Sequence, residues 1–238
     1  MSLRKAIFVV AGVGNGSGTG AASARAFAKA GYRVALIARN AEHLQNTAKS
    51  IIADGGEAAP FPIKAYTHAD VKSGFDAIKK HWPDSDIRVA VWNAALFVRK
   101  GFLELSEAEI EESTQTNIIG AFAFAREALL AFKDLELNDK GKRGSLIFTS
   151  ATAAWRGNKT TAAFSSGKTG QRALAQSLNK EFGPQNIHVS NVIIDGPILT
   201  DRTKTYFSKD LLEDEDRRLS PDSIANVSAC AGELGMGS

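Results

Sequence analysis

The segment richest in chemical information is a glycine-rich loop, Gly12-Val13-Gly14-Asn15-Gly16-Ser17-Gly18-Thr19-Gly20. Glycine lets a backbone turn tightly and approach a phosphate without a clashing Cβ atom. The short apolar run Ile7–Val10 precedes the loop, and the helical pattern Ala21–Ala30 follows it. A helix amino terminus offers unpaired N–H groups and a positive dipole end, so this order predicts a nucleotide site. An ATP-binding P-loop is the main alternative. Ser166-Gly167-Lys168-Thr169 has its ending, but Ala162 stands where its first glycine belongs.

The end of the second apolar run bears on which nucleotide is bound. It reads Ile37-Ala38-Arg39-Asn40 and contains no acidic residue. An acid at this place accepts hydrogen bonds from the adenosine ribose and marks NAD(H), whereas an arginine can pair with a 2′-phosphate. Arg39 therefore favours NADP(H), with NAD(H) the weaker alternative and a solvated surface arginine the alternative without function.

Apolar runs alternate with helical patterns along the chain. The predicted strands span residues 7–10, 33–38, 58–63, 87–92, 145–149 and 188–194. The predicted helices span residues 21–30, 41–54, 71–82, 106–132 and 161–182. This alternation predicts an α/β fold with a doubly wound parallel sheet. Pro60 and Pro62 place the third strand at an edge. No repeat or linker divides the chain, so we expect one domain over residues 1–238.

Composition excludes several classes of protein. The 238 residues are 44% hydrophobic and 23% charged with a net charge of +3, ordinary values for a globular chain. No basic stripe interleaved with aromatics indicates a nucleic-acid partner, and no apolar run reaches the ~18 residues of a membrane helix. The single cysteine, Cys230, excludes an internal disulfide, and the four histidines share no metal-ligand spacing. We therefore expect a cytoplasmic protein without a metal, a membrane or a nucleic-acid partner.

Several further motifs follow the loop in a fixed order. They are Trp92-Asn93-Ala94-Ala95, Asn117, Lys168 and the run Asp195-Gly196-Pro197-Ile198-Leu199-Thr200. With these motifs the chain, from about Lys5 to Thr203, resembles the short-chain dehydrogenase/reductase family. The resemblance implies a three-layer α/β/α Rossmann domain that binds a nicotinamide cofactor and transfers hydride. It also implies a homodimer or homotetramer that pairs through the helices at 106–132 and 161–182. The cofactor-binding residues it implies are Gly14, Asn15, Gly16, Ser17, Gly18, Thr19, Gly20, Arg39, Asn93, Ala94, Lys168, Gly196, Ile198 and Thr200.

The catalytic motif departs from that family. The family has Tyr-x-x-x-Lys, and this chain has Phe164 four residues before Lys168, which places both side chains on one helix face. The family's catalytic serine lies thirteen residues before the tyrosine. That position is Ala151 here, with Ser150 and Thr152 on either side. The catalytic candidates are thus Asn117, Ser150, Thr152, Phe164 and Lys168. Some relatives also carry phenylalanine at this place, and the chain looks closest to that branch.

Loss of the tyrosine leaves three interpretations open, because a positioned general acid contributes a factor of about 10²–10⁴. In the first, the chain is an NADP(H)-dependent oxidoreductase acting on a small carbonyl, enone or imine. Its proton then comes from Ser150, Thr152, Ser165, Ser166, Lys168 or a held water, and an imine that arrives protonated needs mainly hydride. In the second, the chain binds NADP(H) without turnover and acts as a sensor or oligomeric partner. In the third, the two helices serve chiefly as a dimer interface.

The carboxyl-terminal part departs from the family as well. Residues 201–219 follow the sixth strand, where the family has a substrate lid. Ser220 and Pro221 have the types of a helix cap and a first helical residue. Residues 220–238 contain no strand candidate, so we expect the family's usual last strand to be missing.

Overall fold

The architecture comes from a computed structural model, which describes residues 5–205 and 207–233. One sheet of six parallel strands has the order β3-β2-β1-β4-β5-β6. The strands are β1 (Ile7–Ala11), β2 (Arg33–Ala38), β3 (Glu57–Pro62), β4 (Ile87–Trp92), β5 (Gly144–Ala151) and β6 (Ile187–Ile194). The longer helices are α1 (Thr19–Lys29), α2 (Ala41–Ala53), α3 (His68–His81), α4 (Glu107–Thr114), α5 (Gly120–Phe132), α6 (Ala162–Phe182) and α9 (Pro221–Glu233). The short helices α7 (Asp201–Lys204) and α8 (Lys209–Glu213) follow β6. The predicted doubly wound parallel sheet is confirmed.

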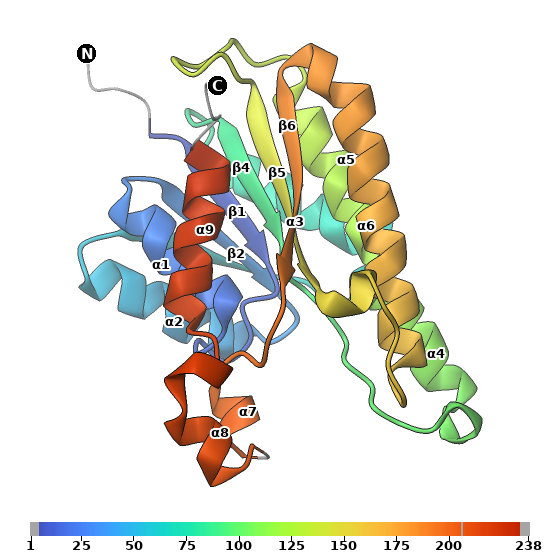
Figure 1. Cartoon of the computed structure of the whole chain (residues 1–238). Helices are drawn as coiled ribbons and strands as arrows, with labels where there is room; N and C mark the ends of the chain where they lie inside the picture. Colours follow the sequence, from blue (N-terminus) through green and yellow to red (C-terminus); the bar gives the residue numbers. More distant parts are fainter. Residues whose placement is uncertain (1–4, 206, 234–238) are drawn as a thin grey trace.

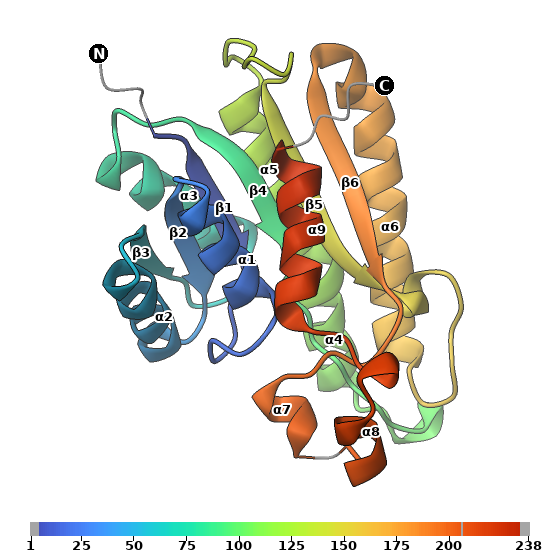
Figure 2. The same ribbon diagram turned by 60° about the vertical axis from the view of Figure 1, so that its left-hand side comes forward.

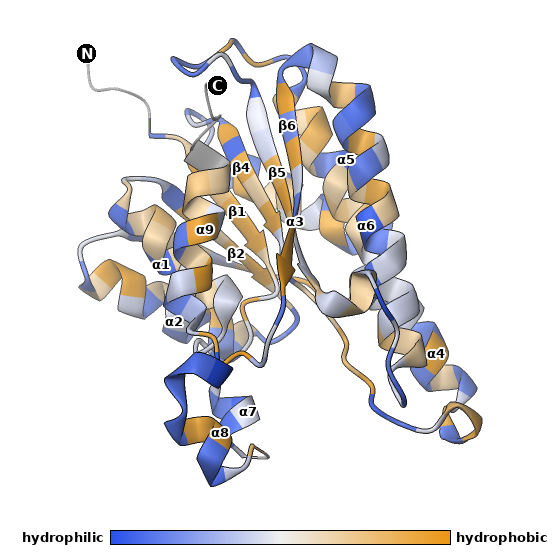
Figure 3. Cartoon of the chain, in the orientation of Figure 1, coloured by the Kyte–Doolittle hydropathy of each residue, from blue (hydrophilic) through white to orange (hydrophobic). Residues whose placement is uncertain are grey.

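Helices cover both faces of the sheet, as Figures 1 and 2 show. Helices α1, α2 and α9 lie on one face, and α3, α5 and α6 lie on the other. Each interface has its own apolar cluster: Phe8 and Phe27 stack in the first, and Phe75 packs edge-on against Phe124 in the second. Figure 3 shows the apolar colouring of β1, β2 and β4, which fits strands buried on both faces.

The sheet ends in two different edge strands. The edge strand β3 carries Pro60 and Pro62, as predicted, because a proline cannot donate to a second neighbour. At the other edge β6 pairs only with β5 among the described residues. Helix α9 contacts α1, β5 and β6 and so lies on a face of the sheet. Ser220 caps this helix as expected, since its Oγ accepts from the N–H groups of Asp222 and Ser223. Of the segment 220–238, residues 234–238 lie outside the described part.

The long helix predicted over residues 106–132 is interrupted. A π-helical turn, η2 (Gln115–Ile119), separates α4 from α5. Ser106 and Glu109 form the expected capping box at the start of α4. The extra residue of a π turn shifts the register of the helix and is frequent at functional sites. This turn contains Asn117, and sequence periodicity alone did not reveal it.

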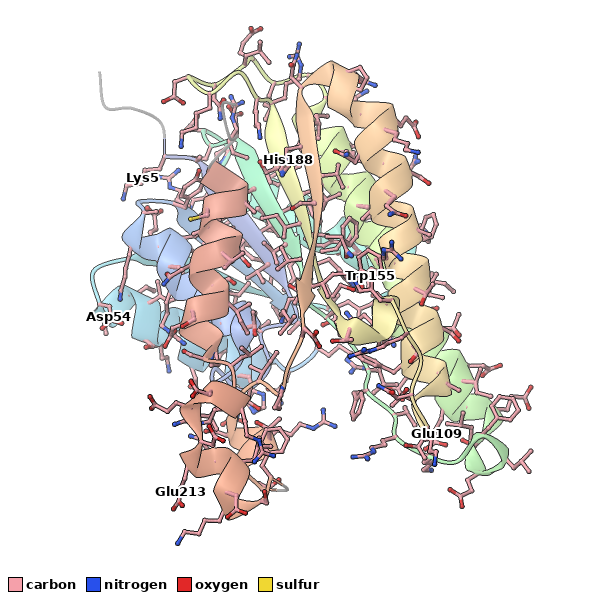
Figure 4. The ribbon with its side chains drawn as sticks, viewed as in Figure 1. Lys5, Asp54, Glu109, Trp155, His188 and Glu213 are labelled. Atoms are coloured by element: carbon pink, nitrogen blue, oxygen red, sulfur yellow. The ribbon has the colours of Figure 1, made fainter. Side chains whose placement is uncertain are left out.

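The carboxyl ends of the strands meet at one edge, at the bottom of Figure 1. The segment with α7 and α8 and the helix α4 lie at this end. In Figure 4 Glu213 of α8 and Glu109 of α4 mark it, whereas Lys5 and His188 lie toward the opposite end. The glycine-rich loop, residues 93–95 and residues 195–200 each follow a strand at this end, and η2 contains Asn117.

Candidate functional site

The glycine-rich loop joins β1 to α1 in a conformation that needs glycine. Gly12, Gly14 and Gly16 have φ values of +92°, +65° and +98°. A Cβ atom at Gly12 would lie 2.4 Å from the backbone nitrogen of Ala94, and one at Gly20 would lie 2.3 Å from the Gly12 carbonyl oxygen. The loop is therefore pressed against the end of β4, where Asn93 Nδ2 donates to the same carbonyl at 2.7 Å.

The start of α1 fits a phosphate group. Gly18 is its N-cap and supplies no side-chain acceptor for the first N–H groups of the helix. The buried hydroxyl of Thr19 has no hydrogen-bond partner within the described residues. A helix start with free donors and a backbone without Cβ atoms forms a cradle for an anion. The loop residues predicted from the sequence thus lie together, and the cradle fits a dinucleotide diphosphate.

The turn after β6 closes over this loop. Asp201 accepts from Asn15 Nδ2 at 3.3 Å, and its backbone N–H donates to Ser17 Oγ at 3.1 Å. A Cβ atom at Gly18 would lie 3.8 Å from Thr200 Cγ2. Thr200 caps α7, and Ile198 bridges to Leu219 at the far end of the 201–219 segment. The predicted residues Gly196, Ile198 and Thr200 therefore belong to a turn that reaches back to the loop.

A cavity of about 290 Å³ lies beside the loop, across the ends of β1, β2 and β4. It is lined by Gly12, Gly14, Ala38, Arg39, Asn40, His43, Tyr66, Asn93, Ala94 and Ala95. The cavity includes the predicted residues Gly14, Arg39, Asn93 and Ala94. Tyr66 is a lining residue that the sequence analysis missed, because it follows β3 by several residues and has no fixed spacing from the other motifs.

Arg39 is held at the mouth of this cavity by two side chains. Its Nη1 pairs with Glu112 Oε1 of α4 at 3.1 Å, and its guanidinium lies 5.6 Å from the centre of the Tyr66 ring. Burial raises the pKa of Tyr66 to about 12, against the opposing charge of Arg39. No carboxylate ends β2, and the acid that does meet Arg39 comes from a different element.

Asn117 holds the π turn against the loop that follows β4. Its Oδ1 accepts from Leu96 N at 3.1 Å, and its Nδ2 donates to Leu96 O and to Ser113 Oγ, both at 3.0 Å. A Cβ atom at Gly167 would lie 2.5 Å from Asn117 Cβ, so α6 packs directly against the turn. The Asn117 side chain is fully buried. Its three partners in these hydrogen bonds are two backbone groups and one hydroxyl group.

Lys168 of α6 is buried, with 3% of its surface exposed. Its Nζ donates to Thr149 O at 2.8 Å and to Gln171 Oε1 at 3.0 Å, and Gln171 Nε2 donates to the same carbonyl at 3.3 Å. Burial lowers the pKa of Lys168 from 10.5 to about 7. No motif in the sequence marks Gln171, although it lies one helical turn after the lysine. The amine is thus poised between its charged and neutral forms near neutral pH.

Phe164 occupies the same face of α6 as Lys168, as predicted. Its ring centre lies 5.8 Å from Lys168 Nζ and 4.9 Å from the centre of the Phe97 ring, in an edge-on contact. The two rings place an apolar surface beside the amine.

The candidate hydroxyl groups differ in access. Ser150 is 3% exposed, and its Oγ has no partner among the described residues. Thr152 Oγ1 donates to Asp195 Oδ1 at the ends of β5 and β6. Ser165 Oγ lies 3.0 Å from Thr161 Oγ1, and Ser166 Oγ donates to Ala162 O at 2.8 Å. Thr152 is therefore the partly exposed hydroxyl that lies beside a carboxylate, a pairing that the sequence analysis did not predict.

Within residues 5–205 and 207–233 no group of three or more His, Cys, Asp or Glu side chains could hold a metal ion. In the same part of the chain no helix is long and apolar enough to cross a membrane.

The family model, two curated relatives and a solved structure that match this chain are all dehydrogenases or reductases. The family model for short chain dehydrogenases matches residues 6–211. The 3-oxoacyl-[acyl-carrier-protein] reductase of Rattus norvegicus is 32% identical over 184 residues, which are 77% of this chain and 72% of that protein. The 3-dehydrosphinganine reductase TSC10A of Arabidopsis thaliana is 31% identical over 93% of this chain, which spans only 62% of that protein's length. A solved short-chain dehydrogenase from Rhodopseudomonas palustris is 28% identical with a TM-score of 0.74, covering 94% of this chain and 90% of its own.

Proposed function

The chain belongs to the short-chain dehydrogenase family of oxidoreductases, and from that premise we propose that it is an NADP(H)-dependent oxidoreductase acting on a small carbonyl, enone or imine. The observation that carries the proposal is the cavity beside the glycine-rich loop, with Arg39 at its mouth. In this proposal the loop and the start of α1 hold the diphosphate, Arg39 pairs with the 2′-phosphate, and Asn93 and Ala94 line the adenosine side. The cofactor supplies hydride.

The chain's own residues prepare the other half of the reaction. Because the pKa of Lys168 is about 7, its Nζ can hold or release a proton near neutral pH. The rings of Phe164 and Phe97 exclude water from one side of this amine. Asn117 holds the π turn that supports α6. The turn at Gly196, Ile198 and Thr200 reaches the loop and is suited to meet the cofactor. We propose that residues 201–219 close over the bound substrate as a lid.

A titration of the purified protein with NADPH and, in parallel, NADH tests the cofactor. Tight NADPH binding and weak NADH binding, followed by nucleotide fluorescence, are expected. Arg39→Met is expected to weaken NADPH and to leave NADH unchanged, because only NADPH carries a 2′-phosphate. If neither nucleotide binds, the proposal fails.

The absence of a tyrosine and of a serine at positions 164 and 151 favours a second candidate function. In it the protein binds NADP(H) without turnover and acts as a sensor or an oligomeric partner. A panel of ketones, enones and imines separates the two: NADPH consumption with any member supports the enzyme. Binding without consumption across the panel supports the second candidate.

We further propose that the protein forms a homodimer or homotetramer in the cytoplasm. A groove of about 390 Å³ between α5 and α6 is lined mostly by apolar side chains, and Phe122 and Leu130 are 49% and 41% exposed on α5. An exposed apolar patch of this kind is typical of an interface. Light scattering is expected to give at least twice the monomer mass, and Leu130→Asp is expected to reduce it. The single cysteine fits a reducing compartment, which cell fractionation can test.

A further inference from the structure

Two side chains at the carboxyl ends of β5 and β6 form a pair that the proposed function leaves unused. In the register of the two strands Ala151 lies beside Ile194, so the residues that follow them, Thr152 and Asp195, leave the sheet side by side. Thr152 Oγ1 donates to Asp195 Oδ1 across this gap. The pair begins one residue after Ala151, the position at which the family resemblance expects the catalytic serine.

The hydrogen bond fixes what this pair can offer a ligand. A threonine hydroxyl has one proton and two lone pairs, and an ionised carboxylate only accepts. Because the proton of Thr152 is committed to Asp195, its oxygen presents lone pairs. The backbone carbonyl of Thr152 is also occupied, by the N–H groups of Trp155 and Arg156. The pair is therefore an acceptor site, suited to an N–H donor or a cation and unsuited to a carbonyl oxygen.

The carboxylate has no cation of its own to neutralise it. In the described part of the chain no Lys, Arg or His nitrogen lies within 4.0 Å of the Asp195 oxygens. The amine of Lys168 donates instead to Thr149 O and Gln171 Oε1. Asp195 is exposed, so a ligand can reach it.

The position at which the family has its tyrosine lacks an acid. Phe164 has no hydroxyl, and its ring faces the ring of Phe97. A neutral ketone accepting hydride needs a donor for the developing alkoxide, whereas a protonated imine needs none. An acceptor pair at the ends of β5 and β6 and the lack of an acid at position 164 thus suit the same substrate, one that brings its own positive charge.

We propose that Thr152 and Asp195 form the binding site for the nitrogen of a protonated imine, so that the substrate class is the imine/amine pair rather than the ketone/alcohol pair. This inference rests on the proposed NADP(H)-dependent activity. The carbon of the C=N⁺ group accepts hydride from NADPH, the π pair becomes the nitrogen lone pair, and the products are an amine and NADP⁺. The step consumes no further proton, so it needs no tyrosine.

The test compares three substrates of similar size with the full chain and NADPH. They are 3,4-dihydroisoquinoline, its N-methyl cation and the ketone 2-tetralone. The first can present both a charge and an N–H donor, the second only a charge, and the third neither. We expect NADPH consumption with the first two substrates, faster with the imine than with its N-methyl cation, and little with the ketone.

Two isosteric variants assign the effect to the pair. Asp195→Asn removes the charge and Thr152→Val removes the hydroxyl. Hydrogen bonds to charged groups contribute about 1.5–3 kcal/mol, so we expect kcat/KM for the imine to fall about 10- to 100-fold in Asp195→Asn. In both variants we expect kcat/KM to fall further for the imine than for the ketone. Asp139→Asn, the same change on an exposed loop at the opposite end of the strands, is the control and is expected to alter none of these values.

The outcomes separate the two proposals. NADPH binding with reduction of the ketone but not of the imine overturns the inference and leaves the proposed function standing. Reduction of the imine that is insensitive to Asp195→Asn, or an equal loss for imine and ketone, also overturns the assignment of the pair. Failure of NADPH to bind at all overturns the proposed function, and the inference falls with it.

Discussion

The nucleotide half and the reaction half of the site are built differently. The nucleotide half comprises the glycine-rich loop and the cavity at the ends of β1, β2 and β4. It consists of backbone in glycine-only conformations and a few polar side chains aimed at one place. The reaction half comprises the π turn, α6 and the ends of β5 and β6. It contains Lys168 and Asn117, but Phe164 stands at the position where the family has the tyrosine that acts as the acid.

The difference shows that binding a diphosphate tolerates fewer substitutions than transferring a proton does. A diphosphate needs backbone N–H groups at close range, and this loop reaches its conformation with positive φ angles at Gly12, Gly14 and Gly16 and with no room for a Cβ atom at Gly12 or Gly20. Proton transfer has more solutions, because it can be supplied by another side chain, by water or by the substrate itself. We therefore expect substitutions in the nucleotide half to abolish binding, and substitutions in the reaction half to change which substrate is reduced.

The largest expected effect comes from Gly20→Ala in the nucleotide half. The added Cβ atom would lie 2.3 Å from the Gly12 carbonyl oxygen and 2.8 Å from Asn93 Nδ2. Overpacking of this kind costs about 1–3 kcal/mol, and it moves the loop that cradles the phosphates. We expect a lower urea midpoint and no saturable NADPH fluorescence signal. Gly183→Ala is the matched control: its Cβ atom meets nothing within 4 Å and its φ is −54°. Normal NADPH binding by Gly20→Ala would show that this loop is not the cradle.

The next effect comes from Phe164→Tyr in the reaction half. Lys168 Nζ lies 5.8 Å from the centre of this ring, so a para hydroxyl adds an acid beside the amine. A positioned general acid is worth about 10²–10⁴ in rate, and we expect ketone reduction to rise about 10²-fold. Imine reduction is expected to change little, because that substrate arrives protonated. Steady-state NADPH consumption measures both rates.

Phe102→Tyr is the control for that gain, since Phe102 is 72% exposed in the loop before α4. A ketone rate that stays flat in Phe164→Tyr would mean that the missing hydroxyl does not limit this reaction. The contrast between the two halves would then rest on the carboxylate of Asp195 rather than on the lost tyrosine.

The structure brings Gly14, Arg39, Asn93 and Ala94 to one cavity, and the sequence could indicate this grouping because its information is local. Glycines at fixed spacing between a strand and a helix, and Arg39 at the end of the next strand, are all read within one β-α-β unit. The side chains it missed depend on long-range register. Asp195 meets Thr152 only because β5 and β6 pair Ala151 with Ile194, and Tyr66 meets Arg39 across the ends of β2 and β3.

The π turn at Asn117 shows a second limit of sequence reading. The apolar periodicity over residues 106–132 favours one continuous helix, and no residue type marks the inserted turn. Tertiary bonds from Asn117 to Leu96 and the close packing of Gly167 hold it there. Gln171 was missed for a related reason: a glutamine on a helix face is usually solvated, and its partners Lys168 Nζ and Thr149 O are evident only in the folded chain.

Lys168→Met tests the balance between stability and chemistry in the reaction half. Burial holds the pKa of Lys168 at about 7, below its ordinary 10.5, so the unfolded chain binds this proton more tightly. The resulting penalty on folding is full below about pH 7 and disappears as the pH rises toward 10.5. We expect Lys168→Met to raise the free energy of unfolding on the order of 1–3 kcal/mol at pH 6, with a smaller gain at pH 9.5. Urea unfolding at both pH values measures it.

The same variant is expected to lose ketone reduction, because the proposed function uses Nζ as the group that holds or releases the proton. Thr149 O keeps a donor in Gln171 Nε2, whereas the buried Gln171 Oε1 loses the donor it has in Lys168, a cost that is the same at both pH values. Lys180→Met, an exposed lysine near the end of the same helix, is expected to change stability equally at both pH values and to keep activity. A gain in Lys168→Met that grows with pH would contradict the burial of a near-neutral amine.

The smallest expected effect comes from Glu112→Gln, at a residue of α4 that pairs with Arg39 of the nucleotide half. This carboxylate on α4 pairs with Arg39 at 3.1 Å, and the two side chains are 52% and 46% exposed. Such exposed pairs contribute about 0.2–1 kcal/mol, so releasing Arg39 by Glu112→Gln should tighten NADPH about two- to fivefold. NADH should be unaffected, because it carries no 2′-phosphate for Arg39 to meet. Glu111→Gln removes the same charge from the neighbouring exposed residue and should leave both affinities unchanged. Equal tightening of NADPH and NADH would mean that Glu112 acts through general repulsion, and Arg39 would lose its role in choosing the cofactor.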